Sequence, residues 1–169
     1  ESLTETEGSL TVENGRITAL NGPAPKGATL IDCGGHCLAP GIVDLGVKVG
    51  EPGERHKESF RSAGLAAAAG GVTTIIARPD TSPAIDTPEG LEFVTRRAAE
   101  ASPVRIRHMA ALTKGRQGRE MVEVGFLLDA GAATAMVEVP DAGAPDAAVA
   151  GLVVVDAGAA VAVAVEPAK

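Results

Sequence analysis

Aromatic residues are nearly absent from this chain of 169 residues, which contains three Phe and neither Trp nor Tyr. Hydrophobic residues still make up 45% of the sequence, so the core must be built from Ala, Val, Leu and Ile. Such a core suits close packing of helices on strands. The scarcity of rings leaves few anchors on which a base or a sugar would stack. The length is sufficient for one domain of ordinary size.

Positive charge and long apolar runs are also scarce. A formal net charge of −7 argues against a nucleic-acid partner or an anionic membrane surface. No apolar run approaches the roughly 18–20 residues that span a bilayer, and the N-terminus shows no signal-peptide pattern. Cys33 and Cys37 flank His36, but no second Cys or His pair would complete a zinc site. We expect two reduced thiols, in a cytoplasmic protein, and nothing favours a disulfide across so short a loop.

The chain is organised around residues 38–53. Pro40-Gly41 leads into the β-branched run 42–49, which a Glu-Pro-Gly turn closes, and this pattern predicts a buried strand. The preceding residues predict small antiparallel strands. A hairpin is expected over 9–21 around an Asn-Gly pair, and a further strand over 29–33.

Helices and strands alternate after this strand. The alternation predicts a parallel sheet with right-handed crossovers, either half of an eight-stranded α/β barrel or a short open sheet. In both cases ligands meet the carboxyl ends of the strands. The Ala-, Val- and Gly-rich residues from 141 onward predict β structure or, alternatively, a low-complexity tail. Thr87 is expected to cap a helix whose first residue is Pro88. We predict helices over 57–69, 88–101 and 119–130, strands over 72–77, 104–112 and 133–139, and two tail strands over 151–156 and 160–165.

Several short motifs, in this order, resemble the dihydroorotases of the amidohydrolase superfamily. Together they cover most of the chain. They are APGIVD (39–44), EPG (51–53), KE (57–58), AAAGGVTT (67–74), PDTSPAID (79–86), AALTKG (110–115), LLDAGA (127–132) and GLVVVD (151–156).

The resemblance implies an α/β fold, a (β/α) barrel of the amidohydrolase type, of which only about four βα units are present here. Both chain ends would form a small β-sandwich, so that 1–39 and 141–169 contribute sandwich strands and 40–140 the barrel part. The family is zinc-dependent and catalyses the reversible cyclisation of N-carbamoyl-aspartate to dihydroorotate in pyrimidine biosynthesis.

The sequence departs from the family pattern where the chemistry lies. The family carries His-x-His followed two residues later by Arg, and these positions are Gly46, Lys48 and Gly50 here. A catalytic zinc needs about three protein ligands, which Gly and a cationic Lys do not supply. We therefore expect no zinc bound by this chain and a solvated or ion-paired Lys48. The family Arg grips the substrate carboxylate through paired hydrogen bonds, which Gly50 lacks the side chain to form.

Two carboxylates near the implied site need separate interpretation. Asp80 replaces a family Asn that helps to hold the substrate carboxylate. An ionised Asp80 would repel that carboxylate by about 4 kcal/mol at about 4 Å and an effective dielectric of about 20. We favour an ion pair of Asp80 with Arg78 over capping of the next residues. Glu138 is the one carboxylate close to the family's bridging-ligand position, and alone it is a weak metal ligand.

The family's remaining ligands, two His and an Asp, come from later strands that this chain does not match. His36, His56 and His108 lie elsewhere and are expected to be structural or exposed. One explanation is an internally deleted form. The other, which we favour because half a barrel leaves open sheet edges, is that these residues are pieces of a longer chain. An intact mass near 16.9 kDa would contradict it.

The degenerate positions are most like those of non-catalytic dihydroorotase homologues, which some bacteria carry as structural partners of aspartate transcarbamoylase. The resemblance then implies an inactive member of a homo-oligomer or of such a complex. The alternative is an active zinc-dependent dihydroorotase, or a related cyclic amidohydrolase such as a hydantoinase or allantoinase, whose other ligands lie in a further segment. A third hypothesis is a scaffold unrelated to pyrimidine synthesis.

Overall fold

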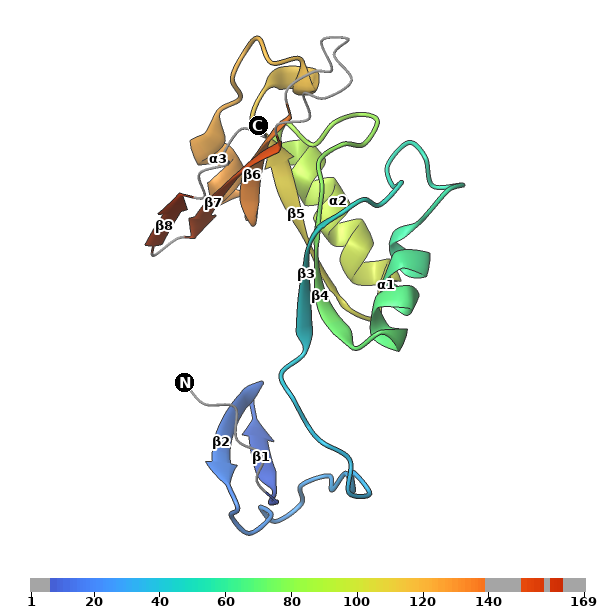
Figure 1. The fold of residues 1–169 in the computed structure, drawn as a ribbon, viewed down its shortest axis with the longest axis vertical. Coiled ribbons are helices and arrows are strands. Elements are labelled where there is room, and N and C mark those ends of the chain that lie inside the picture. The colour runs from blue at the N-terminus through green and yellow to red at the C-terminus, as the bar shows by residue number, and fades with distance from the viewer. Residues whose placement is uncertain (1–6, 139–149, 157–158, 163–169) are drawn as a thin grey trace, which may run out of the picture. The chain divides into compact units, whose positions relative to one another are not determined.

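A computed structural model describes residues 7–138, 150–156 and 159–162, with side chains described up to residue 135. The chain divides into two compact units, Glu1–Ala39 and Pro40–Lys169. Figure 1 draws the elements of each unit. No helix among the described residues combines the length and the apolarity of a membrane span.

The first unit contains one antiparallel hairpin, β1 (Leu10–Glu13) with β2 (Arg16–Leu20). Asn14 and Gly15 join the strands with φ angles of 50° and 74°. Positive φ at both turn residues is typical of the tight turn that an Asn-Gly pair favours, so the predicted hairpin is confirmed.

The strand predicted over 29–33 is wrong. These residues have no strand conformation, and Leu30 and Ile31 are 79% and 84% exposed. Within the described part of this unit, the hairpin is the only pair of strands, and an extended segment without a neighbour satisfies no ladder of hydrogen bonds. A local sequence pattern does not indicate whether a neighbouring strand is available for pairing.

The second unit is built on a six-stranded sheet in the order β3-β4-β5-β6-β7-β8. The first four strands are parallel, and β7 and β8 join the β6 edge antiparallel. The predicted alternation of strand and helix is therefore confirmed. The tail predicted to be β forms two strands, and residues 139 and 163–165 of the predicted strands lie outside the described residues. The strands are β3 (Ile42–Val47), β4 (Val72–Ala77), β5 (Arg105–Ala111), β6 (Thr134–Glu138), β7 (Ala150–Asp156) and β8 (Ala159–Ala162). The predicted sandwich of both chain ends stays a prediction.

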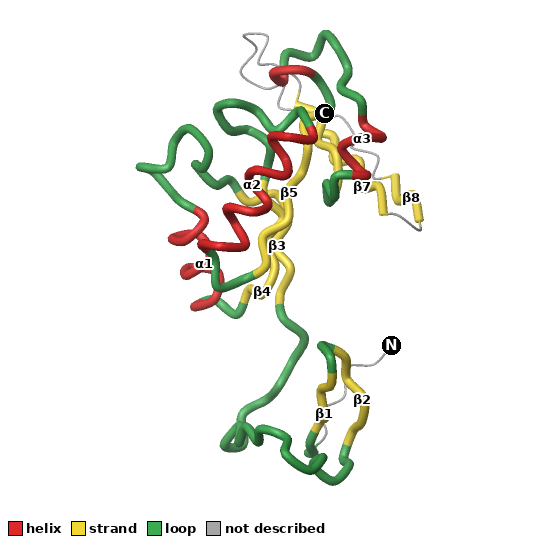
Figure 2. Tube along the Cα trace, turned by 180° about the vertical axis from the view of Figure 1, so that it is seen from behind, coloured by secondary structure: helices red, strands yellow, loops and turns green. Residues whose placement is uncertain are grey.

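Two helices cover one face of this sheet, α1 (Phe60–Ala69) and α2 (Pro88–Ala101), as Figures 1 and 2 both show. Pro88 occupies the first position of α2, and the Oγ1 of Thr87 accepts a hydrogen bond from the Gly90 N–H at 3.2 Å. This is the helix start that the sequence predicted, because Pro lacks an N–H that the first turn would leave unpaired anyway.

The other two predicted helices are shorter than expected. α1 begins at Phe60 and not at residue 57, because Ser59 and Ser62 form a reciprocal capping box there. α3 (Val124–Asp129) begins five residues later than predicted. Met121, which lies within the predicted helix, instead forms a bridge with Thr113 and is 64% exposed. Residues 119 and 120 form bends, and Met121 bridges to the segment after β5, so these residues are not helical.

The core lies between the sheet and the helices. Its largest fully buried side chains include Phe60, Ile75, Leu91, Val94 and Leu127, joined by small Ala side chains. Phe60 is the one buried ring among the three Phe, in agreement with the aliphatic core expected from the composition.

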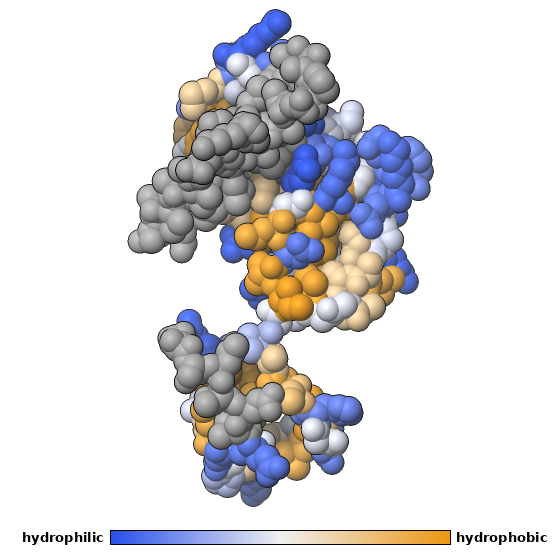
Figure 3. Space-filling view, viewed as in Figure 1, coloured by the Kyte–Doolittle hydropathy of each residue, from blue (hydrophilic) through white to orange (hydrophobic). Residues whose placement is uncertain are grey.

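The opposite face of the sheet is less covered. Val43 and Leu45 pair in register with Thr74 and Ile76, and they remain 54% and 59% exposed. Apolar surface is visible in this part of the unit in Figure 3. In a closed barrel this face would line the interior, so the sheet as described is a partial barrel wall.

Candidate functional site

The carboxyl ends of β3 and β4 bring together the residues that the sequence singled out. Parallel strands place the loops that follow them at one edge of the sheet, which is where α/β barrels bind ligands. Here those loops are residues 48–59 after β3 and 78–87 after β4. The Arg78 N–H donates to the Val47 carbonyl at 2.9 Å, which joins the two loops where they leave the sheet.

Asp80 lies between two cations. Its Oδ2 is 3.2 Å from the Nζ of Lys48 and 3.2 Å from a terminal nitrogen of Arg78. The side chain of Asp80 is 6% exposed, whereas those of Lys48 and Arg78 are 57% and 36% exposed. We call these three residues the Lys48–Asp80–Arg78 cluster. The predicted Asp80–Arg78 pair is confirmed, and of the two states expected for Lys48, solvated or ion-paired, the structure shows an ion pair.

A side chain at residue 46 or residue 50 would not be compatible with the local backbone. Gly46 has a φ of 79°, and the register between β3 and β4 shifts there. A Cβ on Gly50 would lie 2.5 Å from the carbonyl oxygen of Glu54 and 2.9 Å from that of Glu58. Both distances are shorter than real Cβ contacts, and the clashing atoms are backbone. The loop after β3 therefore occupies the space that a side chain at residue 50 would need.

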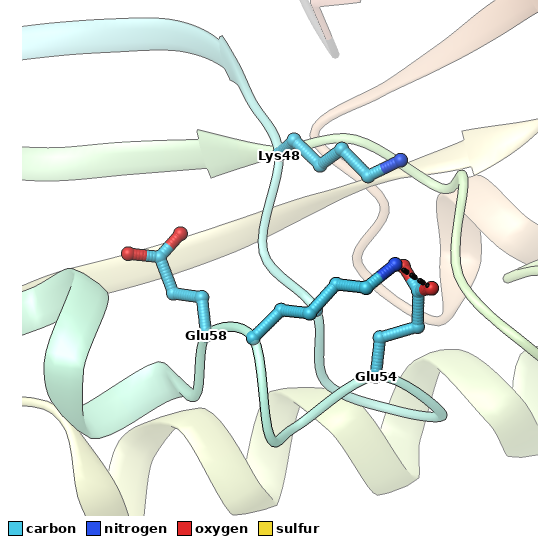
Figure 4. A pocket seen from close by; sticks show the side chains of 5 residues that line it. Lys48, Glu54 and Glu58 are labelled. Carbon is cyan, nitrogen blue, oxygen red and sulfur yellow. Dashed lines mark hydrogen bonds and ion pairs between the residues drawn. The ribbon is translucent and has the colours of Figure 1, made fainter.

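A pocket of about 360 Å³ opens beside Gly50. Lys48, Gly50, Glu54, Lys57 and Glu58 line it, and in Figure 4 Lys48 extends away from Glu58. Glu54 and Lys57 form an ion pair, and the hydrogen bond and charge of Lys57 lower the pKa of the Glu54 carboxyl. The pocket thus carries charges of both signs and would favour neither a cation nor an anion strongly.

Glu51 anchors the loop to two helices, and the sequence did not reveal this role. It is 9% exposed, and its Oε2 accepts a hydrogen bond from the Phe60 N–H at 3.1 Å, at the start of α1. Its Oε1 lies 3.4 Å from Arg97 of α2, and Arg55 lies 3.8 Å from Oε2. A carboxylate is favourable at a helix N-terminus, where unpaired N–H groups carry positive charge. The only local signal was an acidic residue between a strand and a helix.

The remaining candidates do not join this site. His36 and His56 are exposed, and His108 is 3% exposed within β5, where its ring packs edge-on against Phe60. These positions agree with the expectation of structural or exposed histidines. Glu138 is the last residue of β6, and its side chain lies outside the described part of the structure.

Comparison with known proteins identifies the class to which this site belongs. The structure is similar to that of the L-hydantoinase (dihydropyrimidinase) from Arthrobacter aurescens, with a TM-score of 0.64 and 26% sequence identity over 80% of this chain and 31% of that one. The fold is thus a partial α/β barrel of the amidohydrolase type, as the sequence predicted.

Sequence relatives define the family more closely. The dihydro-orotase-like family model matches residues 35–139. The dihydroorotase of Geobacillus thermodenitrificans is 39% identical over 124 residues, which are 72% of this chain and 29% of that protein. The dihydroorotase of Anaplasma phagocytophilum is 43% identical over 112 residues, 66% of this chain and 25% of that protein. The chain belongs to the dihydroorotase-like family, and it spans less than a third of the length of these relatives.

The zinc of this family does not fit the residues at the end of β3. Among the described residues, no group of three or more His, Cys, Asp and Glu side chains is placed to hold a metal ion. Lys48 directs its ammonium group to Asp80, and the two buried carboxylates nearby, Asp80 and Glu51, are already paired with cations. No step of a zinc-dependent reaction is assigned to these side chains.

Proposed function

We propose that this protein is a non-catalytic dihydroorotase homologue of pyrimidine biosynthesis that serves as a structural partner of aspartate transcarbamoylase. The single observation that carries the proposal is the Lys48–Asp80–Arg78 cluster, where two cations neutralise the carboxylate at 3.2 Å each. By the family resemblance, Lys48 stands at a metal-ligand position and Asp80 at a substrate-binding position. The ion pair between Lys48 and Asp80 gives each of these side chains an opposite charge without a metal or a substrate.

We also propose a cytoplasmic location and an association with further protein. Cys33 and Cys37 are exposed free thiols, which supports a reducing compartment such as the cytoplasm. The apolar strand face around Val43 and Leu45 supports burial against further protein, either the rest of a longer chain or another subunit of a homo-oligomer.

The alternative is an active zinc-dependent dihydroorotase or a related cyclic amidohydrolase whose metal ligands lie in a further segment. The identity of 39% to the Geobacillus dihydroorotase and the likeness to a hydantoinase favour it. It requires a metal centre without the usual ligands on β3.

The test is turnover between N-carbamoyl-aspartate and dihydroorotate by the full-length protein, in both directions, with and without zinc. The Geobacillus dihydroorotase serves as the positive control. We expect no turnover above the blank from protein shown to be folded. Zinc-dependent turnover would refute the proposal in favour of the alternative.

The partnership needs its own experiment. The full-length protein is mixed with aspartate transcarbamoylase of the same organism, and the mass of the species is measured by size-exclusion chromatography with light scattering. The proposal predicts one larger complex of fixed stoichiometry. Separate elution at micromolar concentrations of both proteins would contradict the partnership.

A further inference from the structure

We infer that the backbone at the end of β3, and not only its side chains, is incompatible with the zinc site of the family. Restoring the family's residues would then not restore zinc binding. The inference rests on the proposed function in one respect: it takes Gly46, Lys48 and Gly50 to occupy the positions of the family's His, His and Arg. Three independent features of the structure carry it.

The first feature is the conformation of Gly46. Its φ of 79° belongs to a region that L side chains rarely adopt, and space around its Cβ position is open. A histidine here would therefore meet no clash but would strain the backbone. The adjacent shift in register between Leu45 and Val47 ties this conformation to the pairing of β3 with β4. Relief of the strain would require the end of the sheet to re-pair.

The second feature is the loop packed on Gly50. The Glu54 N–H donates to the Gly50 carbonyl at 2.6 Å, which closes a turn directly over residue 50. Glu51 then fastens this loop through the Phe60 N–H and Arg97. An arginine at residue 50 would have to displace backbone that is held at both ends, so its guanidinium group would not reach a substrate in this geometry.

The third feature is the placement of charge. The Nζ of Lys48 crosses from the end of β3 to Asp80 after β4, and thereby joins the two strands. Replacing Lys48 by His would leave Asp80 paired with Arg78 only. A residue that would bind metal in the family therefore links two neighbouring loops in this protein.

The experiment uses the full-length protein and the triple variant Gly46→His/Lys48→His/Gly50→Arg. Zinc retained after incubation with excess zinc chloride and desalting is measured by mass spectrometry, and the melting temperature is measured in parallel. We expect no gain in zinc per chain and a lower melting temperature. One additional zinc per chain in the variant would overturn the inference.

Single substitutions keep the test valid if the triple variant does not fold. We expect Gly50→Ala to lower the melting temperature by about 3 °C or more, while Gly125→Ala in α3, where a Cβ meets open space, does not. Gly46→Val should be more destabilising than Gly46→Asn, because Asn tolerates positive φ better. Equal melting temperatures within both pairs would refute the backbone argument.

The two hypotheses fail separately. Turnover by the wild-type protein would refute the proposed function. A wild-type protein without turnover whose triple variant gains zinc would leave the proposed function standing and refute only this inference.

Discussion

Asp80 is the residue on which the charge balance at the ends of β3 and β4 depends. Its side chain is 6% exposed and faces both Lys48 and Arg78. Removal of this carboxylate would take away the ion-pair partner that Lys48 and Arg78 share. Removing one partner of a partly buried ion pair destabilises a protein more than removing one partner of a surface pair, because solvent screens the charges at the surface.

We predict that Asp80→Asn destabilises the protein by about 2 kcal/mol, even though Asn is the residue that the family resemblance implies at this position. Urea unfolding of the full-length protein measures the effect. The matched control is Glu120→Gln, which changes a carboxylate to an amide in the exposed Lys114–Glu120 pair and should change the stability little, because solvent screens this pair. Equal effects of the two substitutions would show that the Lys48–Asp80–Arg78 cluster has no special importance.

His108 provides a second test at the residue scale. Burial lowers its pKa to about 4, partly offset by a hydrogen bond to the backbone of Val94. Because the folded-state pKa lies below the unfolded value of about 6.5, the folded protein binds fewer protons. Its contribution to stability is complete above about pH 6.5 and is lost as the pH falls towards 4, by up to about 3 kcal/mol.

The prediction is checked by comparing unfolding free energies at pH 7 and pH 5 for wild type, His108→Leu and the exposed-residue control His36→Gln. Wild type and the control should lose more stability between these values than His108→Leu does. The same pH dependence in all three proteins would exclude His108 as the cause.

Ion pairs within a short segment were predictable, and those between distant segments were not. Arg78 and Asp80 are two residues apart, so charge alone indicated their pair. The charge of Lys48 predicted that it would be solvated or paired, but its partner Asp80 is brought near only by the pairing of β3 with β4. Glu51 meets Arg97 across 46 residues of sequence, and no local pattern indicates that contact.

At the scale of elements, the strongest local signals gave the most accurate boundaries. β4 and α2 begin and end where they were predicted, because Gly-Gly and Thr-Pro mark their starts. The helix starts predicted at residues 57 and 119 were wrong. Both lie in charged or polar stretches where helical propensity is high, but tertiary hydrogen bonds determine where the helix begins. The Lys114 N–H, for example, donates to the Glu120 carbonyl at 2.8 Å, and this bond ties residue 120 to the segment after β5 instead of to a helix.

The start of α2 offers a prediction at this scale. Thr87→Ala removes the side-chain acceptor of the Gly90 N–H and should destabilise the protein by about 1 kcal/mol. Thr95→Ala, an exposed position in the middle of the same helix, should be neutral or slightly stabilising because Ala is the better helix former. Chemical denaturation measures both. Comparable losses from the two substitutions would contradict a capping role for Thr87.

At the scale of the whole molecule, the sequence predicted the alternation of strand and helix and the barrel type. It did not predict that β7 pairs antiparallel with β6 and β8 with β7, because strand pairing depends on which edge is free and not on local pattern. The chain spans less than a third of its relatives' length, and the exposed face of β3 at Val43 and Leu45 is consistent with further protein covering it.

The central claim is that the end of β3 is an ion-paired structural link and not a metal centre. The most direct measurement is the zinc content of full-length wild-type protein after incubation with excess zinc and desalting. The account predicts far less than one zinc per chain, because Lys48 and Asp80 neutralise each other where metal ligands would be needed. One or more tightly held zinc ions per chain would contradict it and would favour an active cyclic amidohydrolase.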